Sequence, residues 1–288
     1  MLGVRLLLAC LKISSKLPYP VLMSMGAFAG RIIFRAAHKR RAIAARNLEL
    51  CFPDLTNDER HHLLRAHFTS LGRALFESGL AYWASDDRLH PLAKISGLEN
   101  LQAALSQGRG VILIAGHFTS MEISGRLLGL EVDYDAVIRP FSNPDIDKIV
   151  HSGRHRAVRN AIPKKSFRQF LKGLQENRAI LITVDQATTA SNKVMAPFFS
   201  IPAATSVNAA RIAQKTGAAI LPVLWLREAD LSGYRVEIGE QLTELPTEDS
   251  MADATRINSL IEQQIRRAPE QYYWIHRRFK NEPSPYDD

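Results

Sequence analysis

Cysteine and long uninterrupted hydrophobic runs are both scarce in this 288-residue sequence. The two cysteines, Cys10 and Cys51, are far apart, and neither has metal-ligand spacing or a neighbouring His or Asp pattern. This argues against a cysteine-based zinc site or nucleophile, and we expect two reduced, buried thiols, as suits cytoplasmic exposure. The longest uncharged run near the N-terminus, residues 17–30, is shorter than the roughly 20 residues of a membrane-spanning helix.

Acidic residues are absent between Asp147 and Glu176, and the whole chain carries a formal net charge of +8. Such a charge favours an anionic partner: nucleic acid, a lipid surface, a phosphorylated substrate or an acidic carrier protein. Because the sequence has no helix-turn-helix, zinc or aromatic RNA-binding signature, we expect no nucleic acid, and a nucleic-acid-binding protein is the alternative from another class. A solvated helix face is the plainer interpretation of the basic stretch, whose cations are Lys148, Arg154, Arg156, Arg159, Lys164, Lys165, Arg168 and Lys172.

The N-terminal residues 2–34 are rich in apolar side chains, but Arg5, Lys12 and Lys16 interrupt them. A signal peptide is a poor match, because two of these cations fall inside the stretch that should be apolar. Two apolar helices with scattered cations are typical of an interfacial membrane anchor, and two helices of a soluble core are the alternative. We expect residues 1–40 to associate with the cytoplasmic face of a membrane, because a basic run follows: Arg35, His38, Lys39, Arg40 and Arg41.

Helix-like and strand-like segments alternate along the rest of the chain. Val111–Ala115 is a continuous apolar run that predicts a buried strand, and Thr56 three residues before Glu59 predicts a helix start. The alternation predicts an α/β layered domain with a largely parallel sheet, preceded by N-terminal helices. Further strands are expected at 134–138, 179–184, 218–226 and 234–238, and helices at 39–51, 56–84, 119–130, 166–176, 205–216 and 250–267.

His117 follows the strand at 111–115, and Glu122 lies five residues later in the expected first turn of a helix. Ligands in α/β proteins bind at the carboxyl ends of strands, so we expect His117 to face a cleft. A histidine there suits a general base for a hydroxyl nucleophile, and a carboxylate on its other ring nitrogen would fix the tautomer. The plainer alternatives are a structural histidine, a capping box of Thr119 with Glu122, and an ion pair of Glu122 with Arg126.

Several blocks of this sequence resemble the late acyltransferases of lipid A biosynthesis, within the lysophospholipid acyltransferase superfamily. The His-x4-Glu arrangement after a buried strand resembles the signature of that superfamily. The further blocks occur in order with plausible spacing, and the similarity runs over nearly the whole chain. The blocks are residues 116–126, 138–140, 153–156, 185–186, 196–199 and 267–280.

The resemblance implies an acyltransferase domain, residues 41–288, that moves a fatty acyl chain from a carrier thioester to a hydroxyl of a lipid A precursor at the cell inner membrane. His117 would deprotonate the hydroxyl, and Glu122 would orient His117, with no covalent acyl-enzyme. The donor would be acyl carrier protein or acyl-CoA, and the acceptor an anionic glycolipid, with no cofactor and no metal. Arg154 would face acceptor phosphate or the developing charge, and the substrate-binding residues would be Arg139, Arg154, Asp185 and Gln186.

The sequence departs from this family at one position, where relatives commonly carry a second Asp after the Asp-Gln pair and this chain has Ala187. This keeps open an acyltransferase of the same superfamily that acts on another lipid or polyene acceptor. A catalytically inactive membrane scaffold is a further alternative. In the C-terminal block we expect Tyr273 and Trp274 to be structural, and Arg277 and Arg278 to contact lipid or phosphate.

Overall fold

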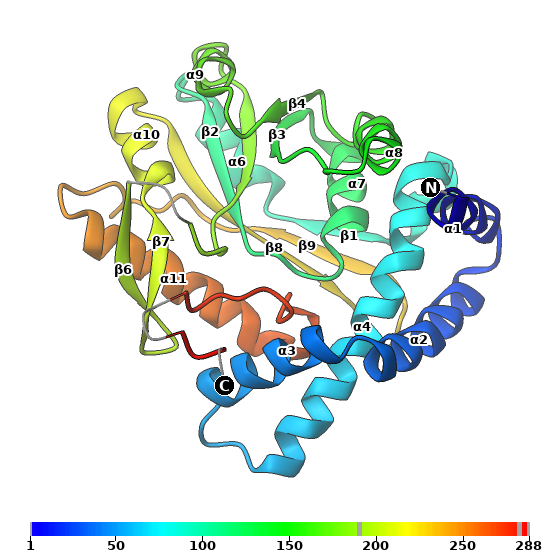
Figure 1. Ribbon diagram of the computed structural model, residues 1–288. Coiled ribbons are helices and arrows are strands. Elements are labelled where there is room, and N and C mark those ends of the chain that lie inside the picture. The colour runs from blue at the N-terminus through cyan, green and yellow to red at the C-terminus, as the bar shows by residue number, and fades with distance from the viewer. Residues whose placement is uncertain (1, 189–191, 281–283, 287–288) are drawn as a thin grey trace.

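Seven strands form the central sheet in the order β1-β9-β8-β2-β5-β3-β4 in the computed structural model, which describes residues 2–188, 192–280 and 284–286 (Figure 1). The neighbouring strands from β8 to β4 run parallel, whereas β9 and β1 run in the opposite direction. The predicted α/β fold with a largely parallel sheet is therefore confirmed. The strands are β1 (Ala93–Ser96), β2 (Val111–Ala115), β3 (Tyr134–Ile138), β4 (Asn160–Pro163), β5 (Ala179–Thr183), β8 (Ala219–Arg227) and β9 (Tyr234–Ile238), and a separate antiparallel pair consists of β6 (Lys193–Phe198) and β7 (Ile201–Ser206).

The register between β2 and β5 determines which side chains meet at the carboxyl edge of the sheet. Ala115 pairs with Thr183 in parallel register, and each strand ends at that residue. His117 and Asp185, two positions beyond these ends, therefore emerge side by side. Because β3 and β4 run in the same direction, Arg139 and Lys164 leave the sheet at the same edge.

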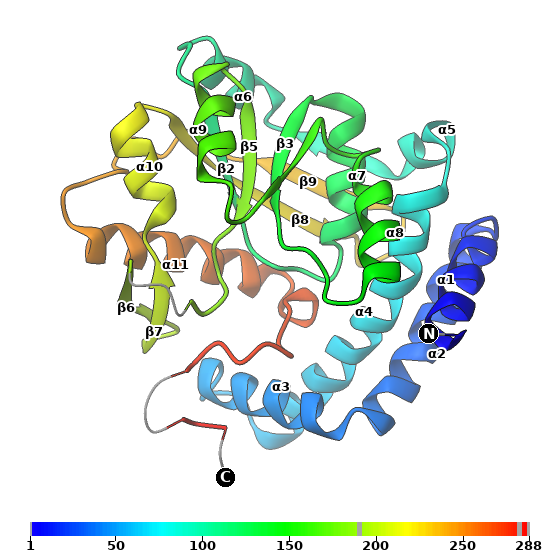
Figure 2. The same cartoon turned by 45° about the horizontal axis from the view of Figure 1, so that its top comes forward.

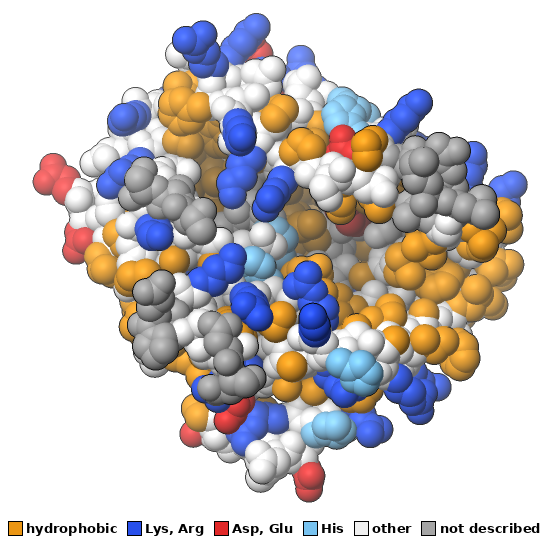
Figure 3. Space-filling model, viewed as in Figure 1, with side chains coloured by type: hydrophobic (Ala, Val, Ile, Leu, Met, Phe, Trp, Pro, Cys, Tyr) orange, Lys and Arg blue, Asp and Glu red, His pale blue; other side chains and the backbone are white. Residues whose placement is uncertain are grey.

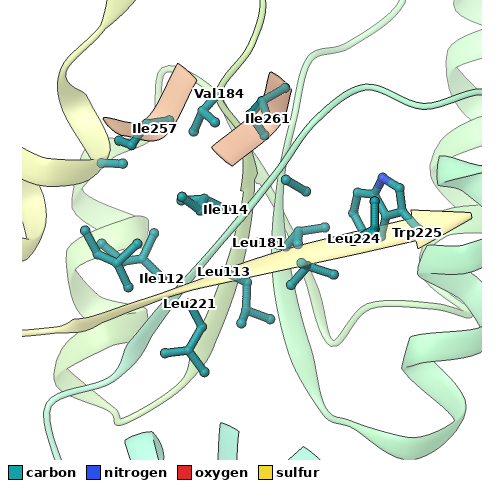
Figure 4. Packing of buried hydrophobic residues seen from close by; sticks show 14 of the residues in the cluster. Ile112, Leu113, Ile114, Leu181, Val184, Leu221, Leu224, Trp225, Ile257 and Ile261 are labelled. Atoms are coloured by element: carbon teal, nitrogen blue, oxygen red, sulfur yellow. The ribbon is translucent and has the colours of Figure 1, made fainter. Parts of the chain in front are cut away.

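The strands are apolar because the centre of the sheet is covered by helices. Every residue of β2 is buried, and Figure 4 shows Ile112, Leu113 and Ile114 among side chains of β5, β8 and α11 (Ser250–Arg267). Burying a side chain of this size stabilises the fold by about 1.5–3 kcal/mol. The central strands are consequently a rigid platform for the residues that follow them.

The four longest helices before the sheet are α1 (Leu2–Ser14), α2 (Tyr19–Ala36), α3 (His38–Cys51) and α4 (Asn57–Trp83). Helices α2 and α4 pack backbone to backbone, since a Cβ atom on Gly72 would lie 2.2 Å from the Gly26 carbonyl oxygen and 2.3 Å from the Gly30 nitrogen. The start of α4 has the predicted capping box between Thr56 and Glu59. Figure 2 shows α1 and α2 along one side of the molecule, beside α4. Among the described residues, no helix is long and apolar enough to cross a membrane.

Several elements differ from the sequence-based predictions. Residues 205–206, expected to be helical, belong to β7, and short strands β1 and β4 were not predicted. Cys10 is exposed rather than buried, because it lies on the outer face of α1, while Cys51 is buried as expected and both are free. Parts of the predicted regions 1–40 and 41–288 lie outside the described residues. These parts are residues 1, 189–191, 281–283 and 287–288. The remaining helices are α5 (Asp86–Leu89), α6 (Leu98–Leu105), α7 (Met121–Glu131), α8 (Pro144–Arg154), α9 (Phe167–Gln175) and α10 (Asn208–Thr216), with 3-10 turns η1 (His90–Leu92) and η2 (Pro269–Gln271).

Candidate active site

His117 and Asp185 form a hydrogen-bonded pair at the carboxyl edge of the sheet. Asp185 Oδ1 lies 2.6 Å from His117 Nδ1, and Asp185 Oδ2 accepts a 3.0 Å hydrogen bond from the His117 backbone N–H. The imidazole is 20% exposed, whereas the carboxylate is only 2% exposed. A carboxylate on Nδ1 favours the tautomer that leaves Nε2 as the proton acceptor.

Asp185 is held in its ionised form despite its burial. Burial alone would raise the pKa of this carboxyl, but the charge and hydrogen bonds of His117, with a contribution from the Tyr272 hydroxyl, lower the pKa to about 2. The carboxylate therefore remains charged near neutral pH. A fixed negative charge behind Nδ1 would stabilise an imidazolium at His117.

Glu122 contacts Arg154 and Tyr82, not His117. Arg154 Nη2 donates to Glu122 Oε1, Arg154 Nε donates to Oε2 at 3.2 Å, and the Tyr82 hydroxyl donates to Oε2 at 3.0 Å. The prediction that Glu122 orients His117 is therefore wrong. The carboxylate that contacts Nδ1 of His117 belongs to Asp185. Burial lowers the pKa of the Arg154 guanidinium, but the Glu122 charge outweighs this effect and raises it overall.

Neither plainer alternative for Glu122 is present in the structure. Thr119 does not cap α7, because its hydroxyl lies 2.7 Å from that of Ser70. Arg126 pairs with Asp86 instead of Glu122. The carboxylate of Glu122 is thus committed to Arg154, and both side chains are about one-fifth exposed.

The C-terminal segment supports the backbone around His117. The backbone N–H of Tyr273 donates to the His117 carbonyl at 3.0 Å, and the Thr119 N–H donates to the Gln271 carbonyl at 2.7 Å. Trp274 is buried, as predicted for a structural residue, whereas Tyr273 is 37% exposed and lines the cleft. The block at 267–280 therefore braces the histidine turn.

Arg278 is buried, which contradicts the prediction that it contacts lipid or phosphate. It is only 2% exposed, and it donates to the Ala204 carbonyl at 2.8 Å and to Thr205 Oγ1 at 3.0 Å. Its guanidinium therefore holds the C-terminal segment against β7. Arg277 is exposed, and its lipid contact stays a prediction.

A buried ion pair behind the turn was missed by the sequence reasoning. Arg227, at the end of β8, donates to both carboxylate oxygens of Glu77 on α4. Arg227 Nη1 also donates to Ser70 Oγ at 2.8 Å, and this hydroxyl contacts Thr119. The sequence offers no signal for such a pair, since its members lie 150 positions apart.

A large cleft lies in front of His117, with a cavity volume of about 1370 Å³. Figure 3 shows Lys and Arg side chains around a hollow in the middle of this face. Five of the six predicted site residues line the cleft, and Asp185 lies behind the imidazole: the five are His117, Glu122, Arg139, Arg154 and Gln186. In the described part of the chain, no group of three or more His, Cys, Asp or Glu could hold a metal ion.

Comparison with known families decides the classification of this fold and cleft. The family model for bacterial lipid A biosynthesis acyltransferases matches residues 2–281. The chain belongs to this family. It is 38% identical to the lipid A biosynthesis palmitoleoyltransferase of Escherichia coli (strain K12), over 93% of this chain and 88% of the relative.

Two further relatives of this lipid A acyltransferase have similar coverage. The lipid A biosynthesis lauroyltransferase of Escherichia coli (strain K12) is 32% identical over 93% of this chain and 88% of its own length. A lipid A biosynthesis acyltransferase of Haemophilus influenzae is 34% identical, over 93% and 86% of the two chains. The predicted membership and enzyme class are confirmed, and the interpretation as a nucleic-acid-binding protein loses its basis.

Proposed function

We propose that this lipid A acyltransferase moves a fatty acyl chain from a carrier thioester to a hydroxyl of a lipid A precursor, with His117 as general base. The observation that carries the proposal is the 2.6 Å contact between His117 Nδ1 and the buried Asp185 carboxylate. It prepares the imidazole to accept a proton at Nε2 in a cleft large enough for lipid chains.

The reaction needs one proton relay and no covalent acyl-enzyme. Nε2 of His117 removes the hydroxyl proton while the oxygen attacks the thioester carbonyl carbon. The resulting imidazolium is stabilised by Asp185. The tetrahedral intermediate collapses to an ester as the C–S bond breaks, and the thiolate takes the proton from His117. The positive end of α7 would stabilise the intermediate oxyanion.

The cations of the cleft suit an anionic glycolipid acceptor. Arg154 is already oriented by Glu122, so its guanidinium can face a phosphate without a large loss of side-chain freedom. Arg139 lines the cleft after β3, and Gln186 adds an uncharged polar side chain beside the histidine. Glu122 thereby acts as a positioning residue for Arg154. Acyl carrier protein and acyl-CoA both satisfy the donor chemistry, and no cofactor is required.

The N-terminal helices provide an apolar surface for interfacial contact with the inner membrane at its cytoplasmic face. Figure 3 shows hydrophobic side chains gathered on the side of the molecule occupied by α1 and α2. Burial of such side chains in the headgroup boundary, with neighbouring cations on anionic lipid, is the usual basis of interfacial binding. The exposed large hydrophobic side chains of α1, α2 and the turn between them are Leu6, Leu7, Ile13, Leu17, Val21, Met25, Phe28 and Ile32.

The test is a transfer assay in detergent with a lipid A precursor and acyl carrier thioesters. The wild-type protein should add the mass of one acyl chain to the precursor, as an alkali-labile ester. His117→Ala should abolish the product while its circular dichroism spectrum and vesicle binding are retained. A variant with near-normal turnover would refute the general-base role.

A further inference from the structure

The basic side chains around the cleft are divided between two opposite ends of the fold. One end is formed by α9 and α10, which contact each other, and the other by α8, α4 and the apolar helices α1 and α2. Figures 1 and 2 both show α9 and α10 on the side of the sheet away from α1 and α2. The two ends therefore face different surroundings if α1 and α2 lie on a membrane.

The α9/α10 end carries an exposed basic cluster. In the described residues none of its five cations makes an ion pair with a carboxylate. Around it, no acidic residue occurs from position 148 to 175 or in α10. Unpaired cations in such a cluster produce a local positive potential that their own chain does not neutralise. The basic cluster consists of Lys164, Lys165, Arg168, Arg211 and Lys215.

An exposed aromatic side chain lies in the same cluster. Phe167, at the first position of α9, is 51% exposed and lines the cleft together with Lys164, Arg211 and Lys215. An apolar side chain surrounded by cations is suited to a protein surface with an apolar centre and an acidic rim. The cluster also opens directly onto the cavity that contains His117.

We propose that the basic cluster with Phe167 is the docking surface for an acidic acyl carrier protein, which delivers its thioester into the cleft from the α9/α10 end. This inference rests on the proposed function. The glycolipid then enters from the opposite end, where the apolar α1 and α2 lie close to α4 and α8. The two substrates thus approach His117 from different sides, and neither blocks the other.

Direct binding tests the docking surface without depending on turnover. Fluorescence anisotropy of a labelled acyl carrier protein is measured with wild type, Arg168→Glu and Arg65→Glu at low and high salt. Arg168 is exposed on α9 and does not line the cleft, whereas Arg65 is an exposed arginine on α4 that lies outside both the basic cluster and the cleft lining. We expect Arg168→Glu to raise the Kd at low salt about fivefold or more and Arg65→Glu to change it less than twofold.

A kinetic comparison adds the readout that separates donor docking from acceptor binding. The donors are the acyl carrier thioester and an uncharged acyl N-acetylcysteamine thioester. Arg168→Glu should lower kcat/KM at least fivefold more for the carrier than for the small donor. Three results would each overturn the docking surface. They are equal losses for both donors, equal effects of the two arginine variants, and a loss of binding to anionic vesicles with binding to the carrier unchanged. Carrier binding with the expected Arg168 dependence but no transfer would instead refute the proposed function and leave the docking surface standing.

Discussion

The substitution Asp185→Asn tests the histidine–aspartate pair with little change in shape. A pKa of about 2 against an ordinary value of 3.8 means that the folded protein favours the carboxylate by about 2 to 3 kcal/mol. Loss of this charge alone would slow a step that forms an imidazolium by nearly two powers of ten. An amide on Nδ1 also favours the wrong tautomer, which in serine protease triads accounts for a loss of about 10⁴-fold. We therefore expect kcat to fall between about 10²- and 10⁴-fold.

The assay is steady-state transfer to a lipid A precursor, measured alongside urea unfolding. Because the folded-state pKa of Asp185 is lowered, its contribution to stability is present above pH 4 and is lost as the pH falls toward 2. The wild type should therefore exceed Asp185→Asn in unfolding free energy at pH 7, and the difference should shrink below pH 4. His117→Ala serves as the comparison variant. Gln186→Glu does not, because it adds a charge beside the pair. A kcat within threefold of wild type in folded Asp185→Asn would refute the reasoning.

Three further substitutions test other parts of the structure. Glu122→Gln should lower kcat/KM about 10- to 100-fold, because Arg154 is misplaced, but it should keep more activity than His117→Ala. If the two variants were equally inactive, Glu122 would take part in proton transfer. Gly72→Ala should lower the unfolding free energy by about 2 kcal/mol, because its Cβ would lie 2.2 Å from a backbone oxygen of α2; unchanged urea unfolding would contradict that packing. Burial lowers the pKa of His67 to about 4 from 6.5. The wild type should therefore lose up to about 3 kcal/mol of unfolding free energy as the pH falls from 6.5 to 4, and His67→Gln should lose less. Parallel curves of unfolding free energy against pH for the two proteins would be inconsistent with a buried neutral histidine.

The strand that leads to His117 could be predicted because its sequence is a continuous apolar run. The strand at 111–115 has the predicted bounds, as does the polar-faced helix at 250–267, and the position of His117 beyond the strand follows directly. Short strands at 93–96 and 160–163 escaped prediction because four residues give too little pattern. Local sequence thus sufficed for the histidine and for five of the seven strands of the sheet.

The partner of His117 could not be predicted, because it depends on the order of strands in space. Glu122 was expected as the partner because the His-x4-Glu block resembles the superfamily signature, but β5 lies beside β2 although β3 and β4 intervene in the chain. Parallel register then brings Asp185 to Nδ1 and leaves Glu122 for Arg154. Arg278 was misjudged for a related reason: its charge suggested exposure, whereas its guanidinium finds carbonyl and hydroxyl acceptors in β7.

The most direct test of the central claim is chemical rescue of a His117→Gly variant. His117 lines an open cleft, so small imidazoles added to the buffer can reach the vacated position. The account predicts an inactive variant in which imidazole restores acyl transfer to the lipid A precursor in proportion to its concentration, with no acylated protein detected by mass spectrometry. A His117→Gly variant that transfers acyl chains at the wild-type rate without imidazole would contradict it.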